Sequence, residues 1–155
     1  MKHFILAMAA LLSLAACSRN SGTDEPTPQP LSSILGTWKL TGIKVLDGKN
    51  ILNVLYSNPA DGCTGKDTFV FNTDGTAVNT QHRFEGPNCR ARTYNYTYSY
   101  NTQTKELTLT QGGGTPQTKE VVKLDNNTFE YVYNISDENS DGTPDKVVHI
   151  YTRAN

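Results

Sequence analysis

The chain has 155 residues, of which 36% are hydrophobic and 19% charged, and its formal net charge at pH 7 is -1. A β-rich chain of this length normally forms one domain with one core, which excludes a second large domain. The near balance of 14 basic and 15 acidic residues lacks the positive excess that a nucleic-acid-binding surface requires.

The N-terminal stretch has the organisation of an export signal. Lys2 precedes an apolar run over residues 4–12, which is shorter than the roughly 20 residues of a transmembrane helix. The stretch ends in Leu14-Ala15-Ala16-Cys17, which resembles the lipobox of bacterial lipoproteins. This resemblance implies that residues 1–16 are a signal peptide and that Cys17 becomes the lipidated first residue. We expect the lipid anchor on Cys17 to attach the protein to the outer membrane of the bacterial cell envelope.

A polar segment separates this anchor from the fold. Residues 17–33 are rich in Ser, Thr, Gln and Pro, with prolines at 26, 28 and 30. Such a composition cannot bury enough apolar surface to fold, so the segment is predicted to be a disordered tether. The folded domain is predicted to span residues 34–155.

The folded domain is predicted to be all-β. Segments of alternating apolar and polar residues are separated by turn signals such as Asn72-Thr73-Asp74-Gly75. Eight antiparallel strands are predicted, at residues 36–46, 67–71, 76–84, 92–100, 106–111, 119–124, 128–136 and 146–153. Strands in this hairpin order close into an up-and-down barrel without free edges. Residues 50–57 depart from the alternation, and their apolar spacing predicts one short helix or folded loop across an end of the sheet.

Two stretches carry a resemblance to a known family. Leu35-Gly36-Thr37-Trp38-Lys39-Leu40 opens the first strand, and Phe69-Val70-Phe71-Asn72-Thr73-Asp74-Gly75-Thr76 spans the next hairpin. With a cysteine before the second strand and another after the third, they resemble the lipocalin-like domain of bacterial surface lipoproteins, over roughly residues 34–154. The resemblance implies an eight-stranded lipocalin-like barrel in which Trp38 packs against Arg153 at the closed end.

Cys63 and Cys89 are the other two cysteines of the chain. Export would place them in an oxidising compartment, where a pair of cysteines usually forms a disulfide. Two cysteines alone are too few ligands for zinc. A bridge would tie the lead-in of the second strand to the loop after the third, with a stabilisation of about 3 to 4 kcal/mol.

A row of tyrosines is the clearest candidate for ligand binding. Tyr94, Tyr96, Tyr98 and Tyr100 alternate with polar residues, so one strand places four phenol rings on one face. The candidate lining of a ligand cavity is this row together with Trp38, Phe129, Tyr131 and Tyr133. The alternative interpretation is core packing with cross-strand aromatic pairs.

The segment from residue 137 to 145 carries oxygen-bearing side chains at alternate positions, with a glycine at 142. This spacing resembles calcium-binding loops. The implied ligands of a structural Ca²⁺ are side-chain oxygens of Asp137, Asn139, Asp141 and Asp145 and the carbonyl of Thr143. The closing position of an EF-hand loop would fall on Val148, which cannot ligate. The alternative is a hairpin loop whose Asp, Asn and Gly residues favour turns.

The sequence shows no catalytic motif, such as a nucleophile elbow, a phosphate loop or a paired acid and base. His82 and His149 have no such partners beside them, and each is expected at the surface or in a cavity lining. We therefore expect a non-catalytic, lipid-anchored lipoprotein that requires no cofactor and whose barrel binds a small apolar or amphipathic molecule. The alternative is a filled barrel that acts through its loops as an adhesion or assembly module.

Overall fold

The computed structural model describes residues 33–47, 52–57 and 62–154, with only the backbone described for 52–57. They all belong to one unit, Ser32–Asn155. The predicted signal peptide, Cys17 and nearly all of the predicted tether lie outside the described residues. None of the described residues forms a helix with the length and apolarity needed to cross a bilayer.

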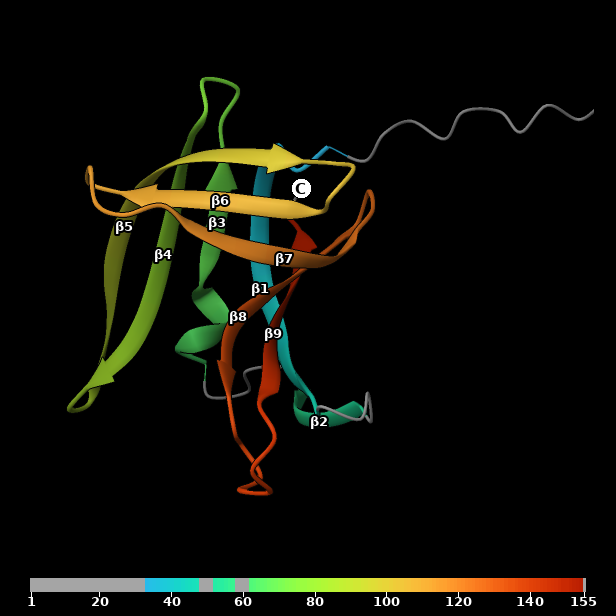
Figure 1. Cartoon of the computed structure of the whole chain (residues 1–155). Helices are drawn as coiled ribbons and strands as arrows, with labels where there is room; N and C mark the ends of the chain where they lie inside the picture. Colours follow the sequence, from blue (N-terminus) through green and yellow to red (C-terminus); the bar gives the residue numbers. More distant parts are fainter. Residues whose placement is uncertain (1–32, 48–51, 58–61, 155) are drawn as a thin grey trace, which may run out of the picture. The chain divides into compact units, whose positions relative to one another are not determined.

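The described unit consists almost entirely of β-strands (Figure 1). One helical turn is described, the 3₁₀ turn η1 at Thr64–Lys66. The strands are β1 Gly36–Leu46, β2 Leu52–Ser57, β3 Thr68–Phe71, β4 Thr76–Glu85, β5 Asn88–Asn101, β6 Glu106–Gln111, β7 Gln117–Leu124, β8 Thr128–Ser136 and β9 Asp145–Arg153.

Eight of these strands form a closed antiparallel barrel. From β3 to β9 each strand pairs with the next along the chain, and β1 pairs with β3 on one side. On its other side β1 pairs with β9, from Trp38 opposite Arg153 to Leu46 opposite Lys146, and this pairing closes the barrel. The predicted eight-stranded up-and-down barrel is therefore confirmed.

The prediction of a helix or folded loop at residues 50–57 is wrong, because Leu52–Ser57 forms β2. The cause lies in the length of the neighbouring strand. β3 has only four residues and pairs with β1 over Gly36–Lys39, which leaves the rest of that edge of β1 without a partner. β2 pairs with β1 from Gly42 to Leu46 and satisfies the backbone groups of this edge.

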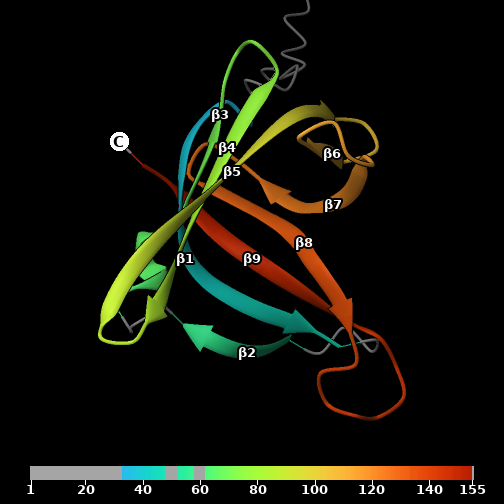
Figure 2. The same ribbon diagram turned by 90° about the vertical axis from the view of Figure 1, so that its left-hand side faces the viewer.

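β5 begins at Asn88, earlier than the strand predicted at residues 92–100. β4 and β5 remain paired as far as Glu85 opposite Asn88, so the hairpin turns within Gly86 and Pro87. Gly86 has φ +64, a conformation that glycine adopts without steric cost. The residues predicted to be a loop are therefore part of a long hairpin, which extends well beyond the ends of β6 and β7 (Figures 1 and 2).

Trp38 and Arg153 define one end of the barrel, called the closed end below. The Trp38 side chain is fully buried, and its Nε1 donates a hydrogen bond to the Ile34 carbonyl at 2.8 Å. The Arg153 guanidinium lies over the Trp38 ring, 4.1 Å from its centroid. The same guanidinium donates to the carbonyls of Ser33, Leu35 and Asn126. The cation–π contact and these bonds join the start of β1, the β7–β8 turn and the end of β9.

The core fills the space behind Trp38. Phe129 lies 5.6 Å from Trp38 between ring centroids, and Phe71 lies 5.6 Å from Phe129 in an edge-on arrangement. Phe69 stacks on Phe71 at 4.4 Å, and Leu107 is fully buried in the same cluster. Aromatic side chains therefore occupy the interior at the closed end, at distances typical of favourable ring contacts.

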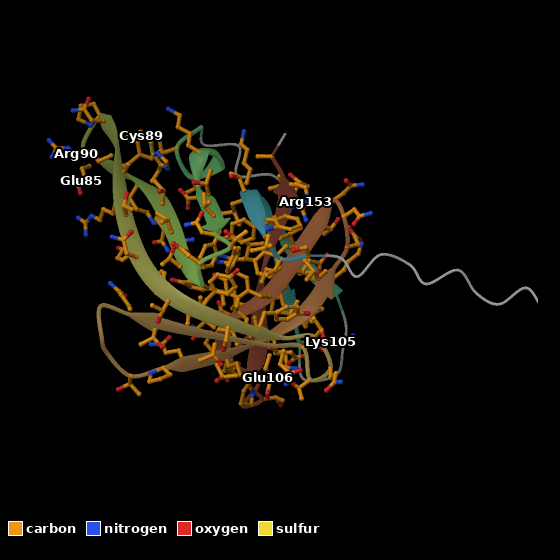
Figure 3. The ribbon with its side chains drawn as sticks, turned by 90° about the horizontal axis from the view of Figure 1, so that it is seen from above. Glu85, Cys89, Arg90, Lys105, Glu106 and Arg153 are labelled. Atoms are coloured by element: carbon orange, nitrogen blue, oxygen red, sulfur yellow. A yellow bond between two sulfur atoms is a disulfide. The ribbon has the colours of Figure 1, made fainter. Side chains whose placement is uncertain are left out.

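The predicted disulfide is present between Cys63 and Cys89, whose Cα atoms lie 5.6 Å apart. Cys63 precedes η1, and Cys89 lies in β5 near the tip of the β4–β5 hairpin (Figure 3). Cys89 was predicted to lie in the loop after the third strand, but it lies within β5, because β5 starts at Asn88. The bond closes a sequence separation of 26 residues, which on the chain-entropy model corresponds to about 3 to 4 kcal/mol of stabilisation.

We predict that Gly36→Ala is strongly destabilising. Gly36 has φ +112, and a Cβ added there would lie 2.9 Å from a guanidinium nitrogen of Arg153. The substitution therefore combines backbone strain with displacement of Arg153, and we expect a loss of about 3 kcal/mol in the free energy of unfolding, measured by urea denaturation.

Gly86→Ala is the matched control for this experiment. Gly86 also has a positive φ, +64, but an added Cβ would meet nothing within 4 Å. We expect a loss of about 1 kcal/mol from backbone strain alone. Equal losses for the two variants would contradict the structural role of Arg153 at the closed end.

Candidate functional site

A cavity of about 930 Å³ lies in the barrel and is partly open to solvent. Its position follows from strand pairing. β6 pairs with β5 only from Tyr96 onward, and β7 pairs with β8 only as far as Tyr131. The first half of β5 and the second half of β8 therefore pair on one side only, and they diverge beneath β6 and β7 (Figures 1 and 2). Residues from both halves line the cavity.

Aromatic rings form a large part of the cavity wall. The aromatic lining residues are Phe69, Tyr94, Tyr96, Tyr131 and Tyr133. Phe69 and Tyr131 are nearly fully buried, so they form the floor. The rings come from three strands, β3, β5 and β8, which the barrel brings together from distant parts of the sequence.

The predicted tyrosine row is divided between the cavity and the core. All four β5 tyrosines lie on one face, as their alternating burial shows. Tyr94 and Tyr96 line the cavity, whereas Tyr98 and Tyr100 do not and pack against the aromatic core. Tyr98 contacts Phe71 edge-on at 4.9 Å and donates a hydrogen bond to the Asn72 carbonyl. Tyr96 has both positions, because it lines the cavity and also packs against the core, with its ring centroid 6.2 Å from that of Phe69.

Two further residues of the predicted lining lie elsewhere. Trp38 and Phe129 are fully buried at the closed end and do not line this cavity. Their rings pack against each other, with 5.6 Å between centroids, at the barrel end where β1, β8 and β9 pair. Trp38 and Phe129 are therefore core residues of the barrel.

The cavity wall also carries polar side chains that the sequence analysis did not identify. Its amides are Asn79, Gln81, Gln111, Gln117 and Asn134, and its one residue with a formal charge is Lys119. Lys119 Nζ donates a hydrogen bond to the Tyr133 carbonyl at 3.0 Å. The alternation of polar and apolar residues along each strand could have indicated Asn79 and Gln81, because they follow Ala77 on the inward face.

Two buried phenols lie at the base of the cavity, Tyr131 in its wall and Tyr151 behind it. Tyr131 and Tyr151 stack with their ring centroids 6.0 Å apart. Burial raises the pKa of Tyr131 well above its usual value of 10.0, and it raises the pKa of Tyr151 in the same direction. Both hydroxyls therefore stay neutral at physiological pH and serve as hydrogen-bonding groups.

His149 is buried, contrary to its expected place at the surface or in the lining. Its ring stacks on Tyr133 with 4.1 Å between centroids and 7° between planes. Its Nδ1 is buried and has no hydrogen-bond partner among the described residues. Burial and, to a smaller extent, the positive charge of Arg83 together lower the pKa of His149 from 6.5 to about 4. The ring is therefore neutral above about pH 5 and supports the wall through Tyr133.

The acidic segment forms the loop between β8 and β9. Asp137 accepts hydrogen bonds from the backbone N–H groups of Asp141 and Gly142. Asn139 accepts from Asp141 N, and Asp141 accepts from Thr143 N. Asp145 is buried and accepts from Glu138 N. These bonds are those of a turn-rich loop.

The predicted calcium ligands are not gathered into one group. In the described ranges, no three His, Cys, Asp or Glu side chains form a cluster that could hold a metal ion. Side-chain oxygens of Asp137, Asn139, Asp141 and Asp145 instead accept hydrogen bonds from the backbone of their own loop. Calcium binding stays a prediction.

Comparison with known families gives a match. The model of the family described as "Lipocalin-like domain" matches residues 34–131, which include β1 to β7 and the beginning of β8. A search of curated proteins gave no match.

Solved structures with a similar fold include three of bovine odorant-binding protein. The complex with a selenium-containing odorant is 15% identical over 84% of this chain and 76% of that chain, with a TM-score of 0.42. The complex with undecanal is 16% identical over 84% and 77%, with a TM-score of 0.41. A deswapped triple mutant is 12% identical over 77% and 72%, with a TM-score of 0.38.

We predict that acid destabilises the protein through His149. An unfolded histidine gains its proton near pH 6.5, whereas folded His149 gains it only near pH 4. As pH falls through this window the unfolded state binds more protons, so stability is lost by up to about 3 kcal/mol. Urea unfolding at pH 7 and at pH 4.5 measures this loss.

His149→Phe isolates the contribution of this residue. Phenylalanine keeps a ring against Tyr133 but cannot bind a proton. We expect the variant to lose about 2 kcal/mol less than the original protein between these pH values, with every other titrating group unchanged. Identical losses would show that His149 does not remain neutral in the folded protein.

Proposed function

Because the chain belongs to the lipocalin-like domain family, whose model matches residues 34–131, we propose that its barrel binds a small amphipathic molecule. The binding site is the cavity between β5 and β8. Members of this family are generally non-enzymatic binding proteins, and we propose the same for this chain. Trp38 and Arg153 then act as structural residues that hold the barrel closed at the opposite end.

The composition of the cavity wall is the observation that carries this proposal. The volume of about 930 Å³ is within the range of sites for small molecules. Five aromatic residues offer flat apolar faces, whereas five amides and Lys119 offer hydrogen bonds. A purely apolar ligand would leave these polar groups without partners, which is costly. An amphipathic ligand satisfies both parts of the wall.

The alternative function, an adhesion or assembly module, was expected to go with a filled barrel. The aromatic core fills only the closed end, and the cavity occupies the space between Tyr94 and Tyr133. This division supports ligand binding over the alternative.

We further propose that lipid on Cys17 anchors the protein in the outer membrane of the bacterial cell envelope. Support comes from the Leu14-Ala15-Ala16-Cys17 sequence and from the disulfide between Cys63 and Cys89, a bond typical of exported proteins. The barrel would then present its cavity outside the cytoplasm.

Ligand binding is tested with N-phenyl-1-naphthylamine, a neutral probe whose fluorescence rises in apolar surroundings. We expect saturable binding of one probe per barrel. Tyr94→Ala should weaken the affinity about fivefold, because it removes one ring from the wall.

Tyr100→Ala is the matched control, since Tyr100 lies on the same face of β5 but outside the cavity lining. It should lower the melting temperature and leave the probe affinity unchanged. If the probe gives no saturable signal with the original protein, the proposed function is wrong.

The anchor is tested by metabolic labelling in a bacterial host with an alkyne analogue of palmitate. The original chain should incorporate the label and sediment with membranes, and Cys17→Ser should abolish both, because the serine hydroxyl cannot form the thioether. Ser18→Ala, one residue further on, should behave like the original chain. Label in the Cys17→Ser variant would contradict lipidation at this residue.

A further inference from the structure

Three arginines extend the inward face of the β4–β5 hairpin beyond the cavity. In the hairpin register Asn79 lies opposite Tyr94, Gln81 opposite Arg92, and Arg83 opposite Arg90. Side chains two residues apart on a strand share a face, at a spacing of about 7 Å. Asn79, Gln81 and Tyr94 line the cavity, so the next positions along the same face belong to Arg83, Arg90 and Arg92, called the arginine strip below.

Contacts of the strip place it beside the cavity. Arg92 interacts with Tyr94, which is part of the cavity wall. Arg83 donates to the buried carboxylate of Asp67 at 3.2 Å and to Gln81, another wall residue. The charge of Arg83 also acts on His149, whose ring stacks on Tyr133 across the barrel. Arg83 and Arg92 therefore lie at the edge of the cavity, and Arg90 follows them along the same face toward the hairpin tip.

The arrangement of charge within the strip is unfavourable for folding alone. Arg83 and Arg90 lie directly opposite each other, and like charges in such positions destabilise a hairpin. Glu85 offsets part of this repulsion, with contacts to Arg90 at 3.4 Å and to Arg92 at 2.8 Å. Figure 3 shows Glu85 and Arg90 together near Cys89 at the hairpin tip, away from Arg153.

The strip has unused capacity for an anion. The Arg83, Arg90 and Arg92 side chains are 49%, 67% and 65% exposed, and each guanidinium has five N–H donors. Counting Lys119, the cavity wall and the strip carry four cationic side chains, and the strip pairs with two carboxylates, Asp67 and Glu85, whereas the whole chain carries a formal net charge of -1. Positive charge is thus concentrated at the cavity and its edge.

We propose that the ligand is an anionic amphiphile, with its apolar or aromatic body in the cavity and its acid group held by the arginine strip at the cavity edge. This inference rests on the proposed function, since it assigns a ligand class to the same cavity. A guanidinium pairs well with the planar oxygens of a carboxylate and with those of a sulfonate or phosphate. The aromatic wall orients the body, and the strip selects the charge.

Two probes that share one scaffold test the ligand class. 8-Anilino-1-naphthalenesulfonate carries an acid group, and N-phenyl-1-naphthylamine is the same ring system without it. Both fluoresce on binding, and each should displace the other if they share the cavity. The deciding quantity is how the ratio of their two Kd values changes with substitution and with salt.

Arg92→Gln removes the charge of the strip residue that interacts with Tyr94 of the cavity wall, and it keeps hydrogen-bonding groups. We expect it to weaken the sulfonate probe about fivefold and to change the neutral probe less than twofold. Lys123→Gln is the matched control, because it removes one exposed positive charge from β7 outside the cavity lining and should change neither Kd.

The original protein provides a test that needs no substitution. Raising NaCl from 0.05 to 0.5 M should weaken the sulfonate probe and leave the neutral probe unchanged, because salt screens exposed charges. If Arg92→Gln and salt affect both probes equally, or neither, the proposed ligand class is wrong while cavity binding stands. If neither probe binds saturably, the proposed function fails as well.

Discussion

The closed end of the barrel depends on Arg153, the last residue of the last strand, β9. A single guanidinium covers the Trp38 ring and binds carbonyl oxygens from the start of β1 and from the β7–β8 turn. An arginine has the planar fork that can serve several acceptors at once while its face stacks on an aromatic ring. Gly36 has no side chain because that guanidinium occupies the space. The Gly-x-Trp pattern and Arg153 are therefore parts of one packing arrangement.

The closed end allows the opposite half of the barrel to be less tightly packed. Large rings fill the interior near Trp38, and the pairing of β1 with β9 holds the barrel together along its length. β6 and β7 are short, so the halves of β5 and β8 beyond them pair on one side only. The disulfide at Cys89 fixes the free half of β5 to the segment before η1. The disulfide therefore holds the β4–β5 hairpin in place on one side of the cavity, where β5 has no second strand partner.

The sequence predicted most of the strands because alternation and turn residues act locally. The strands at 36–46, 106–111 and 128–136 have the predicted bounds. β2 was missed because its formation depends on the short β3, which leaves part of β1 without a partner, and no local pattern records that. Likewise Tyr94 and Tyr100 each stand between two polar residues in the sequence, yet only Tyr94 lines the cavity, since strand pairing far along the chain decides where the interior stays open. The places of Lys119 and His149 depend on the same distant pairing, and local alternation does not indicate them.

The bonds of Arg153 have a consequence for orientation. They hold Ser33 and the last strand residue together, so the chain enters and leaves the barrel at the closed end. The cavity and the arginine strip belong to the other half. The chain before Ser33 is therefore joined to the barrel through the closed end and not through the residues that line the cavity. A change in that preceding segment would leave the cavity wall and the arginine strip as they are.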